Sequence, residues 1–440
     1  MQNIFVNISK YILLFLMIFY TLNGFSALKI NASKTKTMVL YYLQNIWVLF
    51  IIAISNLVLF INTNDQNYAF FMAYEILITI GIHVIYKLLY ERYNKALLNH
   101  QCMLLALGLI MLSRLDSQRA MKQLYIAVFS IILTAIIPFL IKKFDIWNKL
   151  TYVYITLGIV GLLVVLVGGH REYGAKISLT FAGTSIQPSE FVKILFVLGL
   201  SCALYKAKDL FDYALLSFLS IVHIVILLLS RDLGGASILF VIYILMFFLA
   251  THSYLFLIPN VLFMAGGLYV AEKHLTHVQN RILAWKDPLS HVSGAGYQVS
   301  QSLFAIGSGG WFGSGLYKGM PNKIPVVSKD FIFAAFSEEF GSFFAICLIL
   351  TYTSCFILIM NLSLQKKDKF QSLVAAGFGL SFGFQVFLSI GGVIKFIPST
   401  GVTMPFISAG GSSLMSSFIM FAIIQGMGMK KKARMYLENE

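Results

Sequence analysis

Long runs of apolar residues, separated by short polar stretches, recur along the whole chain. The runs are about 18 to 25 residues long, the length that a helix needs to cross a bilayer. Only helices and closed barrels pair all their backbone groups inside a membrane, so the pattern predicts an all-α, polytopic membrane protein with about thirteen spans. The predicted spans are 11–28, 38–62, 69–90, 98–114, 122–141, 150–168, 187–205, 211–230, 233–251, 254–272, 331–361, 370–395 and 404–428.

Three polar stretches interrupt this pattern, at 169–189, 273–330 and 394–413. The longest contains "GYQVSQSLFAI", whose helical spacing places Tyr297, Val299, Leu303 and Ile306 on an apolar face. We expect it to fold back on the bundle and roof a cavity. The third stretch, "IKFIPSTGVTMPFISAGGSS", is broken twice by proline, so its irregular backbone must be buried in protein. If the three stretches converge, they form an external cleft.

Composition agrees with a membrane protein, and the charge distribution predicts its orientation. The chain is 58% hydrophobic and 12% charged, with a mean hydropathy of +0.82. Its net charge of +15 comes from basic clusters in every second loop, which places the N-terminus outside and the C-terminus in the cytoplasm. Acidic lipid headgroups, and not nucleic acid, are the partners that this distribution indicates. The clusters are Lys29/Lys34/Lys36, Lys87/Arg92/Lys95, Lys142/Lys143/Lys149, Lys206/Lys208, Lys366/Lys367/Lys369 and Lys430–Lys432 with Arg434.

Several chemical patterns are better interpreted as structural. All four cysteines fall in apolar runs without CxxC spacing, which indicates small buried side chains (Cys102, Cys202, Cys347 and Cys355). The glycines at 307–315 follow no strand, so they indicate tight turns and close backbone approach and not a dinucleotide site. Glu272, His274 and His277 have a spacing that suits metal ligands, but their loop position favours solvated side chains.

Five motifs occur in a fixed order: "SIQPSEFVK", "RDLGGA", "GAGYQVSQSLFAIGSGGWFGSGL", "DFIFAAFSEEFG" and "IPSTGVTMPFISAGGSS". Together they resemble the SEDS family (FtsW/RodA/SpoVE) over residues 98 to 430. The resemblance implies a glycosyltransferase core at 98–440, including an extracytoplasmic loop at 273–330, and three accessory transmembrane helices at 1–97. It further implies a peptidoglycan glycosyltransferase that polymerises lipid II outside the bacterial cytoplasmic membrane, for cell division or cell shape, with a class B penicillin-binding protein as partner.

Asp330 is the candidate catalytic residue. An acid in a helix's first turn can simply cap that helix. Alternatively, a carboxylate in a partly dry cleft can remove the proton of an attacking sugar hydroxyl. The resemblance favours the second interpretation, because Asp330 matches the family's catalytic aspartate in "DFIF". The leaving lipid pyrophosphate then needs charge neutralisation from a divalent metal (Mg or Mn) or from a nearby cation. The candidate cations are Lys176, Arg231, Lys318, Lys323, Lys329 and Lys395.

Other polar residues are candidates for substrate contacts or for structural roles. Glu190 and Lys193 are spaced for an i,i+3 pair, which suits helix support and cavity lining equally. Gln298, Gln301, Ser412 and Ser413 are candidate substrate-binding residues. Asp232, Glu338 and Glu339 are candidate structural residues: Asp232 by pairing with Arg231, and one of the glutamates by pairing inside the bundle.

The chain departs from the family pattern at several positions, which leaves alternative functions open. Ser178, Val326, Thr400 and Ala409 replace the usual tryptophan, glutamate, lysine and tyrosine, and Arg231 replaces a proline. A flippase for lipid-linked precursors would need a polar path through the membrane, but few intramembrane charges occur beyond Glu75, Glu338 and Glu339. The third hypothesis is an inactive scaffold for a penicillin-binding protein.

Overall fold

The computed structural model describes residues 2–28, 34–144, 146–172, 175–181 and 184–429. Within these residues, twelve helices are long and apolar enough to cross a membrane, so the chain is a multi-pass α-helical membrane protein as predicted. Together with the helices that are not counted as spans, the α-helices of the described residues are α1 (Gln2–Ala27), α2 (Lys34–Thr63), α3 (Asn67–Leu89), α4 (Lys95–Leu115), α5 (Ser117–Ala135), α6 (Ile137–Lys143), α7 (Thr151–Gly168), α8 (Pro188–Lys206), α9 (Leu210–Leu229), α10 (Leu233–Thr251), α11 (Tyr254–His274), α12 (Thr276–Lys286), α13 (Tyr297–Gly309), α14 (Ile332–Phe340), α15 (Ser342–Leu364), α16 (Lys369–Val393) and α17 (Gly411–Gly428).

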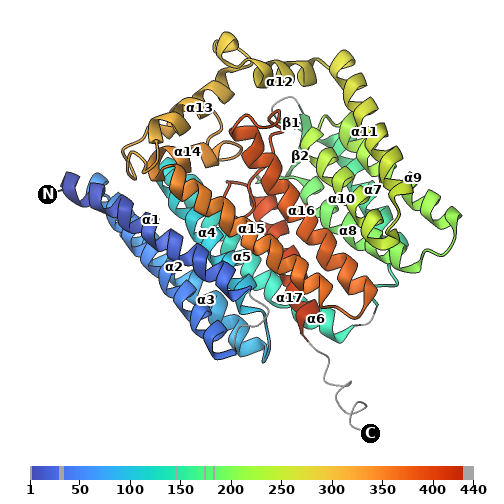
Figure 1. The fold of residues 1–440 in the computed structure, drawn as a ribbon, viewed down its shortest axis with the longest axis horizontal. Helices are drawn as coiled ribbons and strands as arrows, with labels where there is room; N and C mark the ends of the chain where they lie inside the picture. The colour runs from blue at the N-terminus through green and yellow to red at the C-terminus, as the bar shows by residue number, and fades with distance from the viewer. Residues whose placement is uncertain (1, 29–33, 145, 173–174, 182–183, 430–440) are drawn as a thin grey trace, which may run out of the picture.

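Helix α4 lies at the centre of one half of the bundle. Every residue of its most apolar stretch is buried, because neighbouring helices cover it on all sides. Figure 1 shows α1–α3 along its outer flank and α15 and α5 on the other side. At Gly108 an added Cβ would lie 2.7 Å from the Ile407 Cα, so glycine allows the irregular segment 394–410 to pack directly on α4.

Hydrogen bonds join α1–α3 to the rest of the bundle within the apolar interior. The His100 ring on α4 bonds to the Tyr20 hydroxyl at 3.2 Å and to the Ser354 hydroxyl at 3.3 Å, and so links α1 to α15. Asn99 donates to Gln44 Oε1 at 2.9 Å and so links α4 to α2. Polar side chains away from water associate in this way because an unpaired group there is costly.

The predicted single span at 331–361 is wrong, because Gly341 divides it into α14 and α15. Gly341 has a φ of 88°, and an added Cβ there would lie 2.3 Å from the Gly313 nitrogen. Ser342 N donates to the Gly310 carbonyl at 2.9 Å. The glycine-rich turn at 307–315 therefore packs backbone to backbone on the helix break, which confirms the close approach expected of it. The nine residues of α14 extend for only about 14 Å, too short to cross a bilayer.

A buried ion pair fixes α14 against α4. The Arg114 Nη2 lies 2.9 Å from the Glu339 Oε1, and the two side chains are 9% and 0% exposed. Arg114 also donates to the Gly319 carbonyl at 3.1 Å, while Glu338 Oε1 accepts from Met320 N at 2.7 Å. The two glutamates thus tie the loop before α14 to the helix itself.

The long outer stretch folds over the bundle as an arc of helices. Figure 1 shows α12 and α13 crossing one end of the molecule between α11 and α14. Trp285 Nε1 donates to the Lys395 carbonyl at 3.2 Å, and Ser302 donates to the Val393 carbonyl at 2.7 Å, so both helices are attached to the end of α16. Val299 is buried as predicted, but Tyr297 is 40% exposed, because it lies at the start of α13 beyond the packed face.

The stretch at 169–189 forms a small antiparallel sheet of three strands in the order β1-β2-β3. β1 (His170–Glu172) pairs with β2 (Ala175–Phe181) with His170 opposite Ser178, and β2 pairs with β3 (Thr184–Ile186) with Leu179 opposite Ile186. Lys176 N donates to the Ser230 carbonyl at 2.9 Å, which attaches the sheet to the turn between α9 and α10.

Removing the cation of the buried ion pair tests its structural role. Arg114→Met leaves Glu339 buried without its partner, and we expect unfolding free energy to fall by about 3–5 kcal/mol. Thermal unfolding in detergent measures this as a lower Tm. The double variant Arg114→Met/Glu339→Gln should recover part of the loss. Lys122→Met, at an exposed position of α5, is the control; an equal Tm for Arg114→Met and Lys122→Met would contradict the prediction.

Candidate functional site

Asp330 lies immediately before α14, on a backbone segment that two other elements hold in place. Ala409 N donates to the Ser328 carbonyl at 2.8 Å, and Arg119 on α5 donates to the Ser328 hydroxyl at 2.7 Å. Ser408 donates to the Lys329 carbonyl. The position of Asp330 is therefore set by the irregular segment 394–410 as well as by α14.

Arg281 on α12 faces Asp330 across Gly401. A methyl group placed on Gly401 would lie 3.6 Å from the Asp330 Oδ2 and 3.8 Å from the Arg281 Nη2. The Nη1 of Arg281 is buried and has no hydrogen-bond partner among the described residues. A cation and a carboxylate thus meet at one glycine, and the guanidinium retains a donor for a ligand.

The environment of Asp330 disfavours its charged form. Burial raises the pKa of Asp330 to about 6, although the cations Lys329 and Arg281 oppose this shift. Burial likewise lowers the pKa of Arg281, and Asp330 opposes that shift. A carboxyl group with a pKa near 6 is mostly ionised at neutral pH and still accepts a proton readily.

A polar cleft begins at Gly401 and extends between α8, α10 and the segment 394–410. Its walls enclose about 460 Å³, part of it open solvent. The residues that line it are Gln187, Ser189, Glu190, Lys193, Leu227, Asp232, Gly235, Ile238, Leu239, Gly401, Val402 and Thr403. Because Gly401 borders both this cleft and the Asp330–Arg281 pair, two of the three outer stretches meet here.

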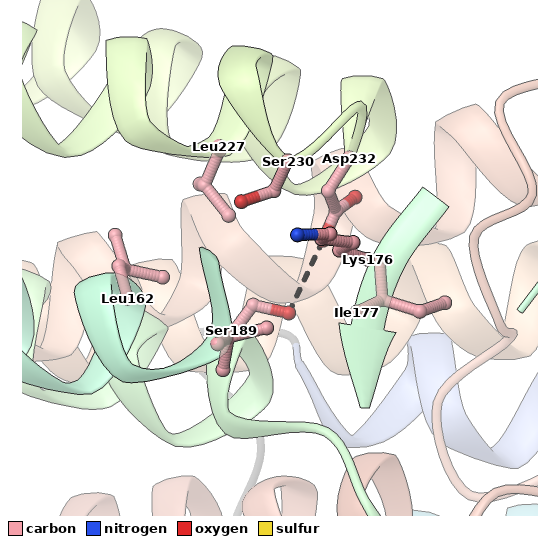
Figure 2. Close-up of a pocket in the computed structure, with 8 residues that line it drawn as sticks. Leu162, Lys176, Ile177, Ser189, Leu227, Ser230 and Asp232 are labelled. Atoms are coloured by element: carbon pink, nitrogen blue, oxygen red, sulfur yellow. Dashed lines mark hydrogen bonds between the residues drawn. The ribbon is translucent and has the colours of Figure 1, made fainter. Parts of the chain in front are cut away.

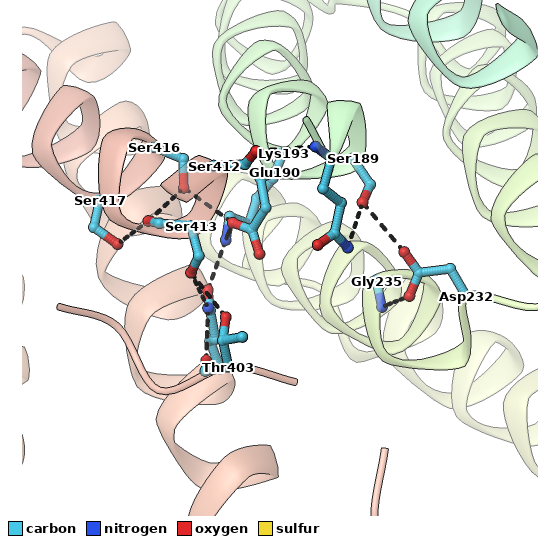
Figure 3. A network of polar contacts seen from close by, with 12 residues as sticks. Ser189, Glu190, Lys193, Asp232, Gly235, Thr403, Ser412, Ser413, Ser416 and Ser417 are labelled. Atoms are coloured by element: carbon cyan, nitrogen blue, oxygen red, sulfur yellow. Dashed lines mark hydrogen bonds and ion pairs between the residues drawn. The ribbon is translucent and has the colours of Figure 1, made fainter. Parts of the chain in front are cut away.

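Glu190 and Lys193 form the predicted ion pair at 2.9 Å, inside a hydrogen-bonded network drawn in Figure 3. Lys193 also donates to Gln385 Oε1 on α16 at 2.6 Å, and Ser416 on α17 donates to Glu190 Oε2 at 2.9 Å. Gln385 donates to the Thr403 carbonyl at 2.9 Å. The network therefore connects three helices with the segment 394–410 and forms part of the cleft wall.

Asp232 does not pair with Arg231, contrary to the sequence prediction. Its Oδ1 accepts from Gly235 N at 2.8 Å and so caps α10, and its Oδ2 accepts from Ser189 at 3.2 Å. Arg231 instead has a φ of 63° and points its side chain to the exterior. Capping satisfies the free N–H groups at the start of α10, which explains why the acid lies there.

Lys176, from the stretch at 169–189, lies beside two residues that line the cleft, Ser189 and Asp232. It lines a small pocket beside Ser189, Ser230 and Asp232, and Figure 2 shows its ammonium group near the Asp232 carboxylate. Lys176 Nζ donates to the Leu166 carbonyl at 3.2 Å. All three outer stretches thus contribute side chains around Asp232 and Gly401, and the expected convergence is confirmed.

The remaining candidates are placed differently. Ser412 accepts from Gln187 N at 2.9 Å and Ser413 accepts from Thr403 at 2.8 Å, so both belong to the network. Lys318 donates to Asn7 on α1 at 3.1 Å. Five of the candidates are not among the described residues that line the cleft: Gln298, Gln301, Lys318, Lys323 and Lys329. Lys329 acts on the site as the neighbouring charge of Asp330.

Two contributors, Arg281 and Gln385, were not identified from the sequence. Gln385 is an amide inside an apolar span, and such a residue signals a polar contact in the bundle. Arg281 is spaced four residues from Trp285, which places both on one face of α12. Neither pattern names a partner, because Lys193 and Asp330 lie far away along the chain.

The profile of a family described as "cell cycle protein", which covers FtsW, RodA and SpoVE, matches residues 95–433. The chain belongs to the FtsW/RodA/SpoVE family. The match begins at the first residue of α4, so α1–α3 lie outside it.

Proteins with an assigned activity are found among the relatives of this FtsW/RodA/SpoVE member. Peptidoglycan glycosyltransferase RodA of Mycobacterium tuberculosis is 32% identical over 350 residues, which cover 72% of this chain and 74% of that protein. The probable peptidoglycan glycosyltransferase FtsW of Aliivibrio salmonicida is 30% identical over 309 residues, which cover 67% of this chain and 76% of that protein.

Solved structures share the fold. A chain from a study of how a peptidoglycan synthase complex coordinates polymerization and crosslinking aligns with a TM-score of 0.65 at 23% identity, covering 77% of this chain and 98% of that chain. RodA of Thermus thermophilus aligns with a TM-score of 0.57 at 23% identity, covering 78% and 99%.

Two positions where this family member departs from the usual pattern, Thr400 and Val326, lie close along the chain to Gly401 and Asp330. Thr400 precedes Gly401, and its buried hydroxyl has no hydrogen-bond partner in the described residues. Val326 has a φ of 56°, an uncommon conformation for a β-branched residue, and its carbonyl accepts from Lys329 N and Asp330 N. The substitutions thus alter the surroundings of Asp330 and leave the carboxylate in place.

The raised pKa of Asp330 predicts how its replacement changes stability. The folded state holds this proton more tightly than the unfolded state, so above about pH 6 the ionised carboxylate lowers stability. Asp330→Asn should therefore raise Tm at pH 7.5, and the gain should disappear near pH 4. Thermal unfolding at both pH values measures the difference.

Asp287→Asn is a control for which the expected change in Tm has the opposite sign. Hydrogen bonds from Ser290 lower the pKa of this exposed carboxyl, so Asp287→Asn should lower Tm at pH 7.5, if only slightly. An Asp330→Asn variant that is less stable than the parent at pH 7.5 would rule out the environment described for Asp330.

Proposed function

We propose that the protein is a peptidoglycan glycosyltransferase, which polymerises lipid II at the outer face of the bacterial cytoplasmic membrane during cell division or cell-shape maintenance. One observation carries the proposal: a half-buried carboxylate, Asp330, and the cation Arg281 lie beside Gly401, which lines a polar cleft, in a chain of this family. The names of its relatives support the same activity.

The reaction joins two sugars by displacing a lipid pyrophosphate. The oxygen of an acceptor hydroxyl attacks the anomeric carbon of the donor, and the bond from that carbon to the phosphate oxygen breaks. The electron pair leaves on undecaprenyl pyrophosphate. Asp330 Oδ2, which faces Gly401, accepts the proton of the hydroxyl as the new glycosidic bond forms. Asp330 is then the general base, and its pKa near 6 allows it to be ionised before the step.

Arg281 is suited to the pyrophosphate. Its unpaired, buried Nη1 can donate to a phosphate oxygen, and a guanidinium neutralises charge that develops on a leaving group. The cleft walls on the far side of Gly401, with Glu190 and Lys193, are then available to the sugars. Glu190 and Lys193 bond to each other and to side chains of α16 and α17, so we assign the pair to shaping the cleft.

The proposed steps use side chains of this chain and no divalent cation. The part of the chain that the structure describes contains no group of three or more His, Cys, Asp or Glu side chains that could hold a metal ion. The proton transfer and the charge neutralisation above use only Asp330 and Arg281.

The orientation and the partner follow from the same proposal. The basic loops favour an N-terminus outside and a cytoplasmic C-terminus, which places the cleft on the outer side where lipid-linked sugars are polymerised. A class B penicillin-binding protein is the partner we expect, since the resulting glycan strands need crosslinking. The solved peptidoglycan synthase complex, whose chain shares this fold, is compatible with such a pairing.

Replacing the proposed base tests the chemistry. Asp330→Asn keeps the shape of the side chain but cannot accept the proton, so polymerisation should fall by at least about 100-fold. The measurement is gel analysis of glycan strands made from lipid II by purified protein. Asp287→Asn should retain activity. Full synthesis by Asp330→Asn would refute the role of Asp330, and transport of labelled lipid II across proteoliposomes without polymer would favour a flippase.

The pH dependence reports the pKa of the base. kcat/KM should rise with pH through about 6 and level off above, because only ionised Asp330 accepts the proton. Lys329→Met removes the nearest cation that favours the ionised form, so the rise should move to higher pH. Lys286→Met, which removes an exposed lysine of α12, should leave it in place. A rise near pH 4 in the parent would contradict the environment of Asp330.

A further inference from the structure

Helix α1, which lies outside the family match, contacts the glycine-rich turn and a lysine just after it. Lys10 Nζ donates to the Gly313 carbonyl at 3.0 Å. One turn earlier along α1, Asn7 Oδ1 accepts from Lys318 Nζ at 3.1 Å. The rings of Tyr11 and Phe312 lie 5.6 Å apart. An element of the accessory helices thus contacts a loop of the family core at its outer end.

The turn that α1 contacts is bonded directly to the end of α14. Ser314 N donates to the Glu338 carbonyl and Gly315 N donates to the Glu339 carbonyl, both at 2.9 Å. An added Cβ on Gly313 would lie 2.3 Å from the Glu339 carbonyl oxygen, so no side chain separates the two backbones. Any displacement of Gly313 must therefore move the end of α14 or break these bonds.

The charges around this contact favour a cation at the turn. Glu338 and Glu339 are both buried, and Arg114 forms an ion pair with Glu339. Glu338 Oε2 and Glu339 Oε2 have no hydrogen-bond partner among the described residues. In a low-dielectric interior, a second positive charge close to two carboxylates is stabilising. Lys10 is a cation that binds the same turn whose backbone donates to the Glu338 and Glu339 carbonyls.

We propose that Lys10 is a positioning residue for the site: it holds the glycine-rich turn on α14, and α14 holds Asp330 at its start. The accessory helix α1 thereby contributes to the alignment of the carboxylate without touching the substrate. This inference rests on the proposed function for its catalytic readout, but the contact itself can be tested without activity.

The experiment compares three variants of the full chain in detergent or nanodiscs. Lys10→Met removes the charge and the donor, Lys10→Arg keeps both, and Lys87→Met removes an exposed lysine of α3 as the matched control. The first readout is kcat and KM for lipid II polymerisation, per folded molecule. The second is the rate of amide hydrogen exchange in peptides that cover residues 311–315 and 331–340.

Lys10→Met should lower kcat about tenfold with KM unchanged, since a misplaced base slows the chemical step and not binding. It should also speed exchange in both peptides, while Lys10→Arg restores the rate. A Lys10→Met variant with the kcat and the exchange of Lys87→Met overturns the inference. The inference is also overturned if the whole loss of activity in Lys10→Met comes from a smaller folded fraction. If the parent makes no polymer, the proposed function fails, and the exchange rates alone decide whether Lys10 holds the turn.

Discussion

The buried pair of Arg114 and Glu339 determines where α14 and the loop before it lie. A fully buried carboxylate needs a cation, and the separation of two such charges costs several kcal/mol. Because Arg114 is on α4, whose apolar stretch is completely buried, the pair fixes α14 to the interior of the bundle. The loop at 317–320 then packs around the guanidinium, with Tyr317 4.3 Å from it. Asp330 is placed accurately because α14 has little freedom to move.

The site contains two cation–carboxylate pairs that differ in how completely they are bonded. Glu190 and Lys193 neutralise each other and bond to Ser416 and Gln385, so their network mainly holds helices together. Asp330 and Arg281 are less completely paired, because burial opposes both charges and Arg281 has a free donor. Groups that are costly to bury and incompletely paired are available for a ligand, and structural networks rarely leave them so. The cleft wall thus contains a hydrogen-bonded ion pair, while Asp330 and Arg281, beside Gly401, remain available for a ligand.

The sequence predicted those features that depend on local patterns. Hydropathy located the twelve spans found in the described residues, except that it merged α14 with the span α15, and i,i+3 spacing identified Glu190 with Lys193. Motif order located Asp330. The sequence could not predict features that depend on distant partners. The break at Gly341 arises from contact with Gly313, and the role of Arg281 arises because α12 folds back over the bundle. The assignment of Asp232 to Arg231 failed because the free N–H groups of α10 bind the carboxylate more effectively than an exposed arginine does.

The complete enclosure of α4 has a consequence for biogenesis. The chain is synthesised from its N-terminus, so His100 meets Tyr20 of α1 as soon as both have entered the membrane, whereas its second partner, Ser354, lies 254 residues further along. Until α15 is made, in the last quarter of the chain, His100 and Asn99 can already pair with side chains of α1 and α2. The early helices can therefore protect these polar groups from lipid while the rest of the protein is synthesised.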